Sequence, residues 1–590
     1  MIRELSELGK KIRKVSQDAL KEELISIDLV INQDGSFHSF IPFDKKMTTA
    51  EAITAKKGKA RLLLDKAEEV LNYGGNASTK KHKLFLEKLE QYKDLAELKP
   101  VIAFYYGNKA NGLDKAILEF EKAIPEKERK GNIGFRIRGK DTRIHEEPNV
   151  YQKIIDNYEA NQKILLSKLK TMCSICGKTD YPVIDDPHGM IKRVPDGKTS
   201  GCALVSYNEK AFESYGLKGN NNSAICTNCA KTYVEGLNWL LCNGNPVTIT
   251  ENNGKEKESF RYTNRKQLGS DTAMVFWTRE NTAVEEMELL DTPDEGKIAN
   301  LIDSVTSGDN KKSRYLETDR FYSFTLSGSA ARIAVRDWVE TSLISFQKSI
   351  ATWFRDIAID HYDFDLKKSR AYYSRLYELA RCCQRKNQNE SYDKNDVASA
   401  RIAAYLWKTA LKNTVPPLWI LVAVLKRARL DKNGVTPERA ALIKLILLRN
   451  FKGGIFMDQK KVEGRGNPAA YVCGQIFAVL ESIQYAALGK TNAGIREKYF
   501  TFALTNPAPA FGRLFSLSSK HFTKLKGEKP GLAVVLDREL QSLCKEIKIE
   551  EFPAIFTLEE QGQFAIGYYH QRQKQFNRAE LKEIVEEEQK

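Results

Sequence analysis

Four cysteines in two closely spaced pairs give the strongest chemical signal in the sequence. Cys173 and Cys176 form one CxxC pair, followed directly by Gly177, and Cys226 and Cys229 form a second. Each pair can present two thiolates to one tetrahedral ion from a tight turn, as structural zinc sites do. Four thiolates leave no open position for water, so we expect a structural Zn2+ ion. Reduced cysteines without a metal are the alternative.

Signatures of common enzyme classes are missing from the sequence. Gly-Lys-Thr occurs at 177–179, 197–199 and 489–491, but no glycine stands five positions earlier, as a phosphate-binding loop requires. The sequence also lacks HExxH and GxSxG. We therefore expect neither an ATP-driven motor nor a hydrolase, and we predict that the protein is not an enzyme.

The charge balance favours a polyanionic partner. Lysine and arginine number 93 against 77 acidic residues, which gives a formal net charge of +16, and the charges are interspersed along the chain. Grouped basic residues can meet phosphates while neighbouring polar side chains reach bases. Alternatively, the basic residues are ordinary solvated surface charges, and the run of three asparagines at 220–222 forms an ordinary turn. Our candidate nucleic-acid-binding residues are Lys192, Arg193, Asn220, Asn221, Asn222, Arg332 and Arg336.

The hydrophobic patterns predict an α+β multidomain protein. Leu24–Ile31 and Ser36–Ile41 flank the turn signal at 32–35 and predict a hairpin within a mixed α/β region. Thr272–Trp277 is strand-like, whereas apolar residues recur every three or four positions from Ala330 to Ile357 and beyond. We predict a mixed α/β region at 1–170, a zinc-bearing α+β region at 171–330, a helical region at 331–456 and a helical bundle at 457–590.

The sequence gives no sign of a membrane protein. Its best apolar run, Pro416–Leu425, is far shorter than the roughly 18 residues of a membrane helix. The first 14 residues carry charges throughout, unlike a secretory signal. We expect a cytoplasmic protein, and its ten cysteines then indicate free thiols and metal ligation rather than disulfides.

Several segments, in order along the chain, resemble one protein family. The most specific are Ser206–Gly216 and Gln561–Gln573; Asp271–Trp277 and Ala330–Arg336 also match. Together they resemble the large subunit of the type I-C CRISPR surveillance complex, Cascade. The resemblance implies a non-catalytic subunit whose N-terminal region recognises the protospacer-adjacent motif in double-stranded DNA. It also implies support for R-loop formation.

The resemblance further implies a set of partners. These are a guide RNA, target double-stranded DNA, the backbone, RNA-processing and small subunits of Cascade, and a helicase-nuclease recruited for antiviral defence. In this family the small subunit can be a separately translated copy of the C-terminal part, and Met457 is a candidate internal start. An ordinary internal methionine is the alternative for Met457. For the whole chain, the alternatives are a zinc-containing nuclease or RNA-processing protein and a pure protein scaffold.

Overall fold

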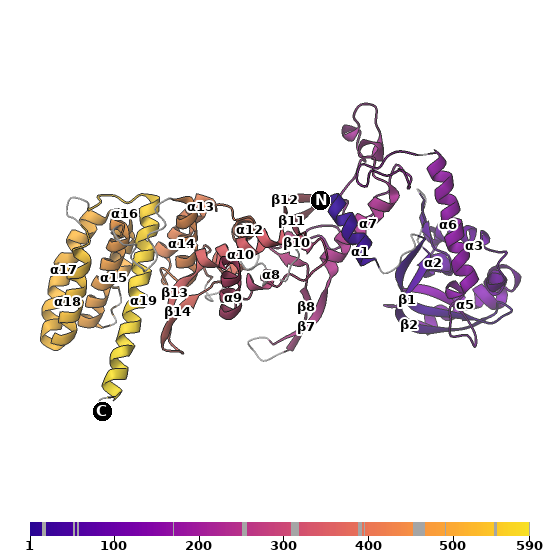
Figure 1. Cartoon of the computed structure of the whole chain (residues 1–590). Helices are drawn as coiled ribbons and strands as arrows, with labels where there is room; N and C mark the ends of the chain where they lie inside the picture. Colours follow the sequence, from indigo (N-terminus) through magenta and orange to yellow (C-terminus); the bar gives the residue numbers. More distant parts are fainter. Residues whose placement is uncertain are drawn as a thin grey trace. The chain divides into compact units, whose positions relative to one another are not determined.

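The computed structural model describes residues 1–13, 19–50, 53–55, 58–168, 170–250, 256–307, 318–387, 392–393, 396–451, 467–489, 491, 493–547 and 552–588. These residues form two compact units (Figure 1). Unit 1 comprises Met1–Met190 and Val205–Leu237, and unit 2 comprises Ile191–Leu204 and Asn238–Lys590. The four-cysteine segment thus groups with the N-terminal region. Met457 lies outside the described residues.

Unit 1 is built on a mixed four-stranded sheet with the strand order β2-β1-β6-β5. Strand β1 pairs antiparallel with β2 and parallel with β6. The strands are β1 (Leu20–Ile31), β2 (Phe37–Ala50), β3 (Ile53–Ala55), β4 (Gly58–Ala60), β5 (Leu64–Lys66) and β6 (Asn132–Ile137). The α-helices are α1 (Ile2–Ile12), α2 (Ala67–Val70), α3 (Asn76–Glu90), α4 (Lys99–Ile102), α5 (Lys115–Ala123), α6 (Pro148–Lys168) and α7 (Thr227–Cys242), whose last residues belong to unit 2.

The predicted N-terminal hairpin is confirmed. The amide of Asn32 donates to the carbonyl of Ser36 over 2.9 Å, and Gly35 takes a left-handed φ of +82° in the turn. Apolar side chains of the sheet then bury against the neighbouring helices. Leu29 and Phe135, both fully buried, belong to the same core as Phe120 of α5.

A buried ion pair ties the central strand of this sheet to the segment after β6. Asp28 of β1 is 1% exposed, and the guanidinium of Arg143 donates two hydrogen bonds to it, of 3.0 and 2.8 Å. Arg143 also stacks over the ring of Phe43, with 3.5 Å from guanidinium carbon to ring centroid. A bidentate pair of this kind fixes both elements in one register, because separating the charges would leave one of them buried alone.

Unit 2 begins with β-structure and continues into helices. Its main sheet is antiparallel, with the order β12-β11-β10-β9, and β7–β8 and β13–β14 form separate hairpins. The strands are β7 (Gly244–Thr250), β8 (Glu256–Tyr262), β9 (Arg265–Gln267), β10 (Thr272–Thr278), β11 (Arg320–Ser329), β12 (Arg332–Ser342), β13 (Ile359–Asp363) and β14 (Lys368–Tyr372). The helices are α8 (Glu286–Leu289), α9 (Glu295–Thr306), α10 (Leu343–Ile357), α11 (Leu376–Arg381), α12 (Val397–Lys412), α13 (Leu418–Leu430), α14 (Pro437–Asn450), α15 (Ala469–Leu488), α16 (Ile495–Thr505), α17 (Pro507–Glu528), α18 (Pro530–Cys544) and α19 (Leu558–Glu588).

The prediction of a continuous helical pattern from Ala330 is wrong for its first part, because residues 332–342 form strand β12. A β-bulge explains the misleading period. Asp337 takes a left-handed φ of +54° where the β11–β12 register shifts. Val335 pairs with Leu326, and the Trp338 ring meets Tyr322 and Phe324, so the two side chains share a face although they are three positions apart. That spacing imitates a helix.

The predicted C-terminal bundle is present as helices α15 to α19 (Figure 1). An apolar stripe on α15, from Val472 to Ala487, is buried. Helices α15 and α19 cross so closely that their backbones touch at two glycines. A Cβ atom at Gly474 would overlap the carbonyl oxygen of Phe564. A Cβ atom at Gly567 would overlap the carbonyl oxygen of Tyr471. A capping box opens α19, since the Glu560 carboxylate accepts from the amide of Thr557 over 2.7 Å.

Candidate metal centre and nucleic-acid surface

The two CxxC pairs meet in unit 1 as one cluster of four sulfur atoms. The Sγ atoms of Cys173, Cys176, Cys226 and Cys229 all lie within 4.8 Å of one another, and three of the four residues are buried. Gly177 closes the first turn with a left-handed φ of +70°, and its amide donates to the carbonyl of Cys173 over 2.9 Å. These four cysteines could therefore hold a metal ion such as zinc.

Backbone amides already face the sulfur atoms. Cys173 Sγ accepts from the amides of Ile175 and Cys226, over 3.4 and 3.3 Å, and Cys226 Sγ accepts from the amide of Cys229 over 3.5 Å. The hydrogen bond between the two thiols of the second pair lowers the pKa of Cys229 and raises that of Cys226, so Cys229 is the one that ionises first. Amides aimed at sulfur stabilise thiolates, the form that ligates zinc, so the donor set fits the ion.

Helix α1 supports this centre by packing against α7. Gly9 lies against the carbonyl of Thr232, with no room for a Cβ atom, and the hydroxyls of Ser6 and Thr232 are 2.7 Å apart. From the same helix, Arg3 Nε donates over 3.0 Å to the carbonyl of Ile175, inside the first CxxC turn. The first residues of the chain therefore hold the cysteine turn in place, although it lies far along the sequence.

The loop before the second pair is organised by Asn220. Its side chain is fully buried, and Nδ2 donates to the carbonyls of Ile184 and Ile225 over 2.9 and 2.7 Å. Its Oδ1 accepts from the hydroxyl of Ser223 over 3.0 Å and from the amide of Ile225 over 3.3 Å. Both polar atoms of Asn220 are thus used within the loop, so its side chain positions Cys226 rather than facing solvent.

The other two asparagines of the predicted triplet differ in exposure. Asn221 is exposed, whereas Asn222 is half-buried and donates to the carbonyls of Leu217 and Gly219 over 3.2 and 3.1 Å. Within this triplet, Asn221 is the side chain most accessible to a ligand.

The remaining candidate residues belong to unit 2. Lys192 and Arg193 are exposed in a loop whose backbone is fixed, because the amide of Lys192 donates to Asn238 Oδ1 over 2.7 Å. Arg193 has a left-handed φ of +58°, and its carbonyl accepts from Arg265 over 3.2 Å. Hydrogen bonds with Asn238 and Arg265 therefore fix the backbone of the loop at 191–204, while its Lys192 and Arg193 side chains are exposed.

The same segment runs beside the tip of the β11–β12 hairpin. The amide of Ala203 donates to the carbonyl of Ala331 over 2.7 Å, and the amide of Ile333 donates back to Ala203 over 3.1 Å. Arg332 and Arg336 are both exposed and share one face of β12, since side chains two and four positions apart in a strand point the same way. The structure thus joins the Lys192–Arg193 loop and the arginine strand in one unit.

The match to known families decides the chain's identity. The family model of "CRISPR-associated protein (Cas_Csd1)" matches residues 3–576. The chain belongs to this family. The resemblance to the large subunit of type I-C Cascade, inferred above from separate segments, is therefore confirmed over nearly the whole sequence. No curated protein gives a significant match to this Csd1-family chain.

The helices and the remaining cysteines of this Csd1-family protein add two observations. Within the described residues, no helix is both long and apolar enough to cross a membrane. Cys202 and Cys242 lie outside the four-sulfur cluster.

Sequence reasoning missed the supporting groups of the metal centre. Arg3, Ser6 and Gly9 are common residue types in a short amphipathic helix, and nothing in their local sequence points to a cysteine turn. The run of three asparagines suggests a nucleic-acid contact for Asn220 and says nothing of its place in the loop before Cys226. Both roles depend on contacts between distant segments, which local patterns do not encode.

Proposed function

We propose that this protein is the non-catalytic large subunit of a type I-C RNA-guided surveillance complex in the cytoplasm. In this role it recognises the protospacer-adjacent motif in double-stranded DNA, supports R-loop formation and recruits the helicase-nuclease. Its other partners are the guide RNA and the backbone, RNA-processing and small subunits. The observation that carries the proposal is the family match over residues 3–576.

The charge and the basic loops support a DNA-binding role. Strand exchange between guide and target is close to balanced, so protein contacts to the flanking duplex and the displaced strand can tip it. Lys192, Arg193, Arg332 and Arg336 are our proposed phosphate contacts in unit 2, and Asn221 is the accessible candidate in unit 1. Exposed cations of this kind hold the backbone without reading its sequence.

The cysteine cluster supports a structural rather than a catalytic metal. Four sulfur donors complete a tetrahedral shell, so a bound Zn2+ would have no position left for water or substrate. We propose that the ion locks the first turn onto α7 and thereby holds the loop containing Asn220 and Asn221. This role separates the proposal from a zinc-containing nuclease, whose ion needs an open position.

The test of the proposed function is target binding by the complex reconstituted with its guide RNA and neighbouring subunits. Two duplexes carry the same guide-complementary sequence and differ only in the few flanking base pairs. Motif recognition predicts that affinity drops at least tenfold when the flank changes. Equal affinity for the two duplexes contradicts it, and degradation of either duplex without the helicase-nuclease favours the nuclease alternative.

We also propose that translation starts internally at Met457 and yields residues 457–590 as the small subunit. The C-terminal bundle supports this, because α15 to α19 carry many buried residues of their own and follow this position in the chain. Replacing the Met457 codon by one for leucine should remove a small C-terminal product while leaving the full chain. Persistence of that product in the codon variant would contradict internal initiation.

A further inference from the structure

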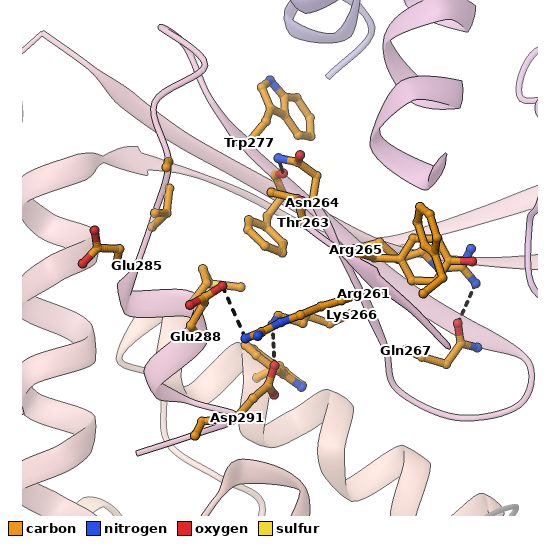
Figure 2. A pocket seen from close by; sticks show the side chains of 18 of the residues that line it. Arg261, Thr263, Asn264, Arg265, Lys266, Gln267, Trp277, Glu285, Glu288 and Asp291 are labelled. Carbon is orange, nitrogen blue, oxygen red and sulfur yellow. Dashed lines mark hydrogen bonds and ion pairs between the residues drawn. The ribbon is translucent and has the colours of Figure 1, made fainter. Parts of the chain in front are cut away.

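Unit 2 contains a pocket of about 640 Å3 that no part of the proposed function uses (Figure 2). One wall is the continuous segment Phe260–Gln267, which runs from the end of β8 into β9, and the facing wall is the segment around α8, residues 282–292. Aromatic side chains from four separate elements line it, including Phe260, Tyr262, Tyr377 and Trp407. Its volume falls within the range of sites that hold small organic ligands.

Two ion pairs join the walls of this pocket, as Figure 2 shows. Arg261 Nη2 of β8 lies 3.5 Å from Glu288 Oε1 of α8, and both side chains are 63% exposed. Lys266 of β9 pairs with Asp291. Each pair places a hydrogen-bond donor beside an acceptor at the surface of the pocket.

The charges of the pocket select against a bare phosphate. The three cations of the pocket already have acceptors, since Arg261 and Lys266 pair with Glu288 and Asp291, and Arg265 donates to the Arg193 carbonyl and to Gln267 Oε1. A phosphate would have to displace these acceptors and would meet repulsion from the two carboxylates. A neutral heterocycle with donors and acceptors on one edge can bond to both members of an ion pair without separating them. Its flat faces can stack on aromatic rings, which stabilises bound bases with little sequence preference.

We propose that this pocket receives one unstacked nucleobase from the single strand that is displaced when the target duplex opens. The base stacks on the Phe260 side of the pocket, and its polar edge faces the Arg261–Glu288 pair. Phe260 is 40% exposed, so an aromatic surface is already available to a ligand. This inference rests on the proposed function, because an opened DNA strand is the source of the base.

An abasic-site scan tests the pocket directly. In the reconstituted complex, the normal base at each position of the displaced strand is replaced in turn by an abasic site, which keeps the phosphate and removes the ring. The wild-type complex should lose about tenfold in affinity at one position. Two variants alter the pocket: Thr263→Trp fills it from an exposed position, and Phe260→Ala removes an aromatic ring. Each should bind the intact strand about tenfold more weakly than the wild type. Neither should lose further affinity when the abasic site stands at the position to which the wild type is sensitive.

The matched control is Phe364→Ala, which removes an exposed phenyl ring from unit 2 outside the pocket and should retain the wild-type pattern. Uniform tolerance of abasic sites by the wild type overturns the inference, as does an unchanged sensitive position in both pocket variants. Failure of the pocket inference can be told apart from failure of the proposed function. Pocket variants should keep their discrimination between flanks, whereas indifference of the wild type to the flank contradicts motif recognition whatever the scan shows.

Discussion

The backbone amide of Cys226 donates to the Sγ atom of Cys173 over 3.3 Å, across 53 positions of sequence. The second cysteine pair thus holds a sulfur of the first before any ion is considered. Helix α1 adds a third attachment through Arg3, which donates to the carbonyl of Ile175. The cluster is therefore the place where three distant segments of unit 1 are joined, and a bound ion would strengthen all of these attachments.

Loss of one cysteine should release the metal. We expect purified wild-type protein to contain about one equivalent of zinc and Cys229→Ser to contain almost none, because three sulfurs cannot complete the tetrahedral shell. Elemental analysis after dialysis measures this. The control is Cys242→Ser, a cysteine of α7 outside the cluster, which should keep its metal. Equal zinc content in the two variants would count against the site.

The crossing of α15 and α19 should tolerate no side chain at Gly474. A Cβ atom there would overlap the Phe564 carbonyl, so Gly474→Ala should lower the free energy of unfolding of unit 2 by about 1–3 kcal/mol. Urea denaturation measures the change. Gly512→Ala in α17 is the matched control, because nothing lies within 4 Å of its added Cβ atom. The control should leave stability unchanged or raise it slightly, since alanine favours a helix.

Stability should fall on acidification because His570 is buried as the neutral form. Burial, aided by Lys444, lowers the His570 pKa from 6.5 to about 3. Between these values the unfolded chain binds a proton that the folded chain does not. This contribution to stability is therefore complete above pH 6.5 and is lost, at about 1.4 kcal/mol per pH unit, as the pH falls towards 3.

The measurement for His570 is the free energy of unfolding across this pH range. His570→Gln should show a shallower slope than the wild type, and His38→Gln, at an exposed position, should retain the wild-type slope. If all three proteins lose stability in parallel, another group governs the acid response.

Arg332 and Arg336 should contribute to target binding through phosphates. Replacing both by alanine should weaken duplex binding and reduce the slope of log affinity against log salt by about one to two, because fewer counterions are released. A control with Arg355→Ala and Lys297→Ala removes two exposed cations from α10 and α9 of the same unit. If the variant lacking Arg332 and Arg336 matches the control in affinity and salt slope, these two arginines do not contact the DNA.

Much of the fold followed from local sequence. The turn at 32–35, the buried stripe of α15 and the Thr557–Glu560 cap each depend on neighbouring residues, so local patterns can specify them. The four cysteines were also recognisable, because CxxC spacing is itself the geometry of a two-ligand turn.

The rest depended on tertiary contacts. The bulge at Asp337 gave β12 an apolar spacing that imitates a helix, and only pairing with β11 reveals the strand. In the sequence Asn220 is a polar residue available for binding, but in the folded loop its side chain is occupied by the carbonyls of Ile184 and Ile225. The aromatic pocket gathers residues as far apart as Phe260 and Trp407, which no local pattern connects.

Complexes assembled with and without this chain show whether it is the subunit that recognises the flanking motif. Both are given the same guide RNA and the same pair of target duplexes, which differ only in the flanking motif. We expect the complete complex to distinguish the two flanks at least tenfold and the complex lacking this chain to bind both weakly and equally. Flank discrimination that persists without this chain would contradict its role as the subunit that recognises the motif.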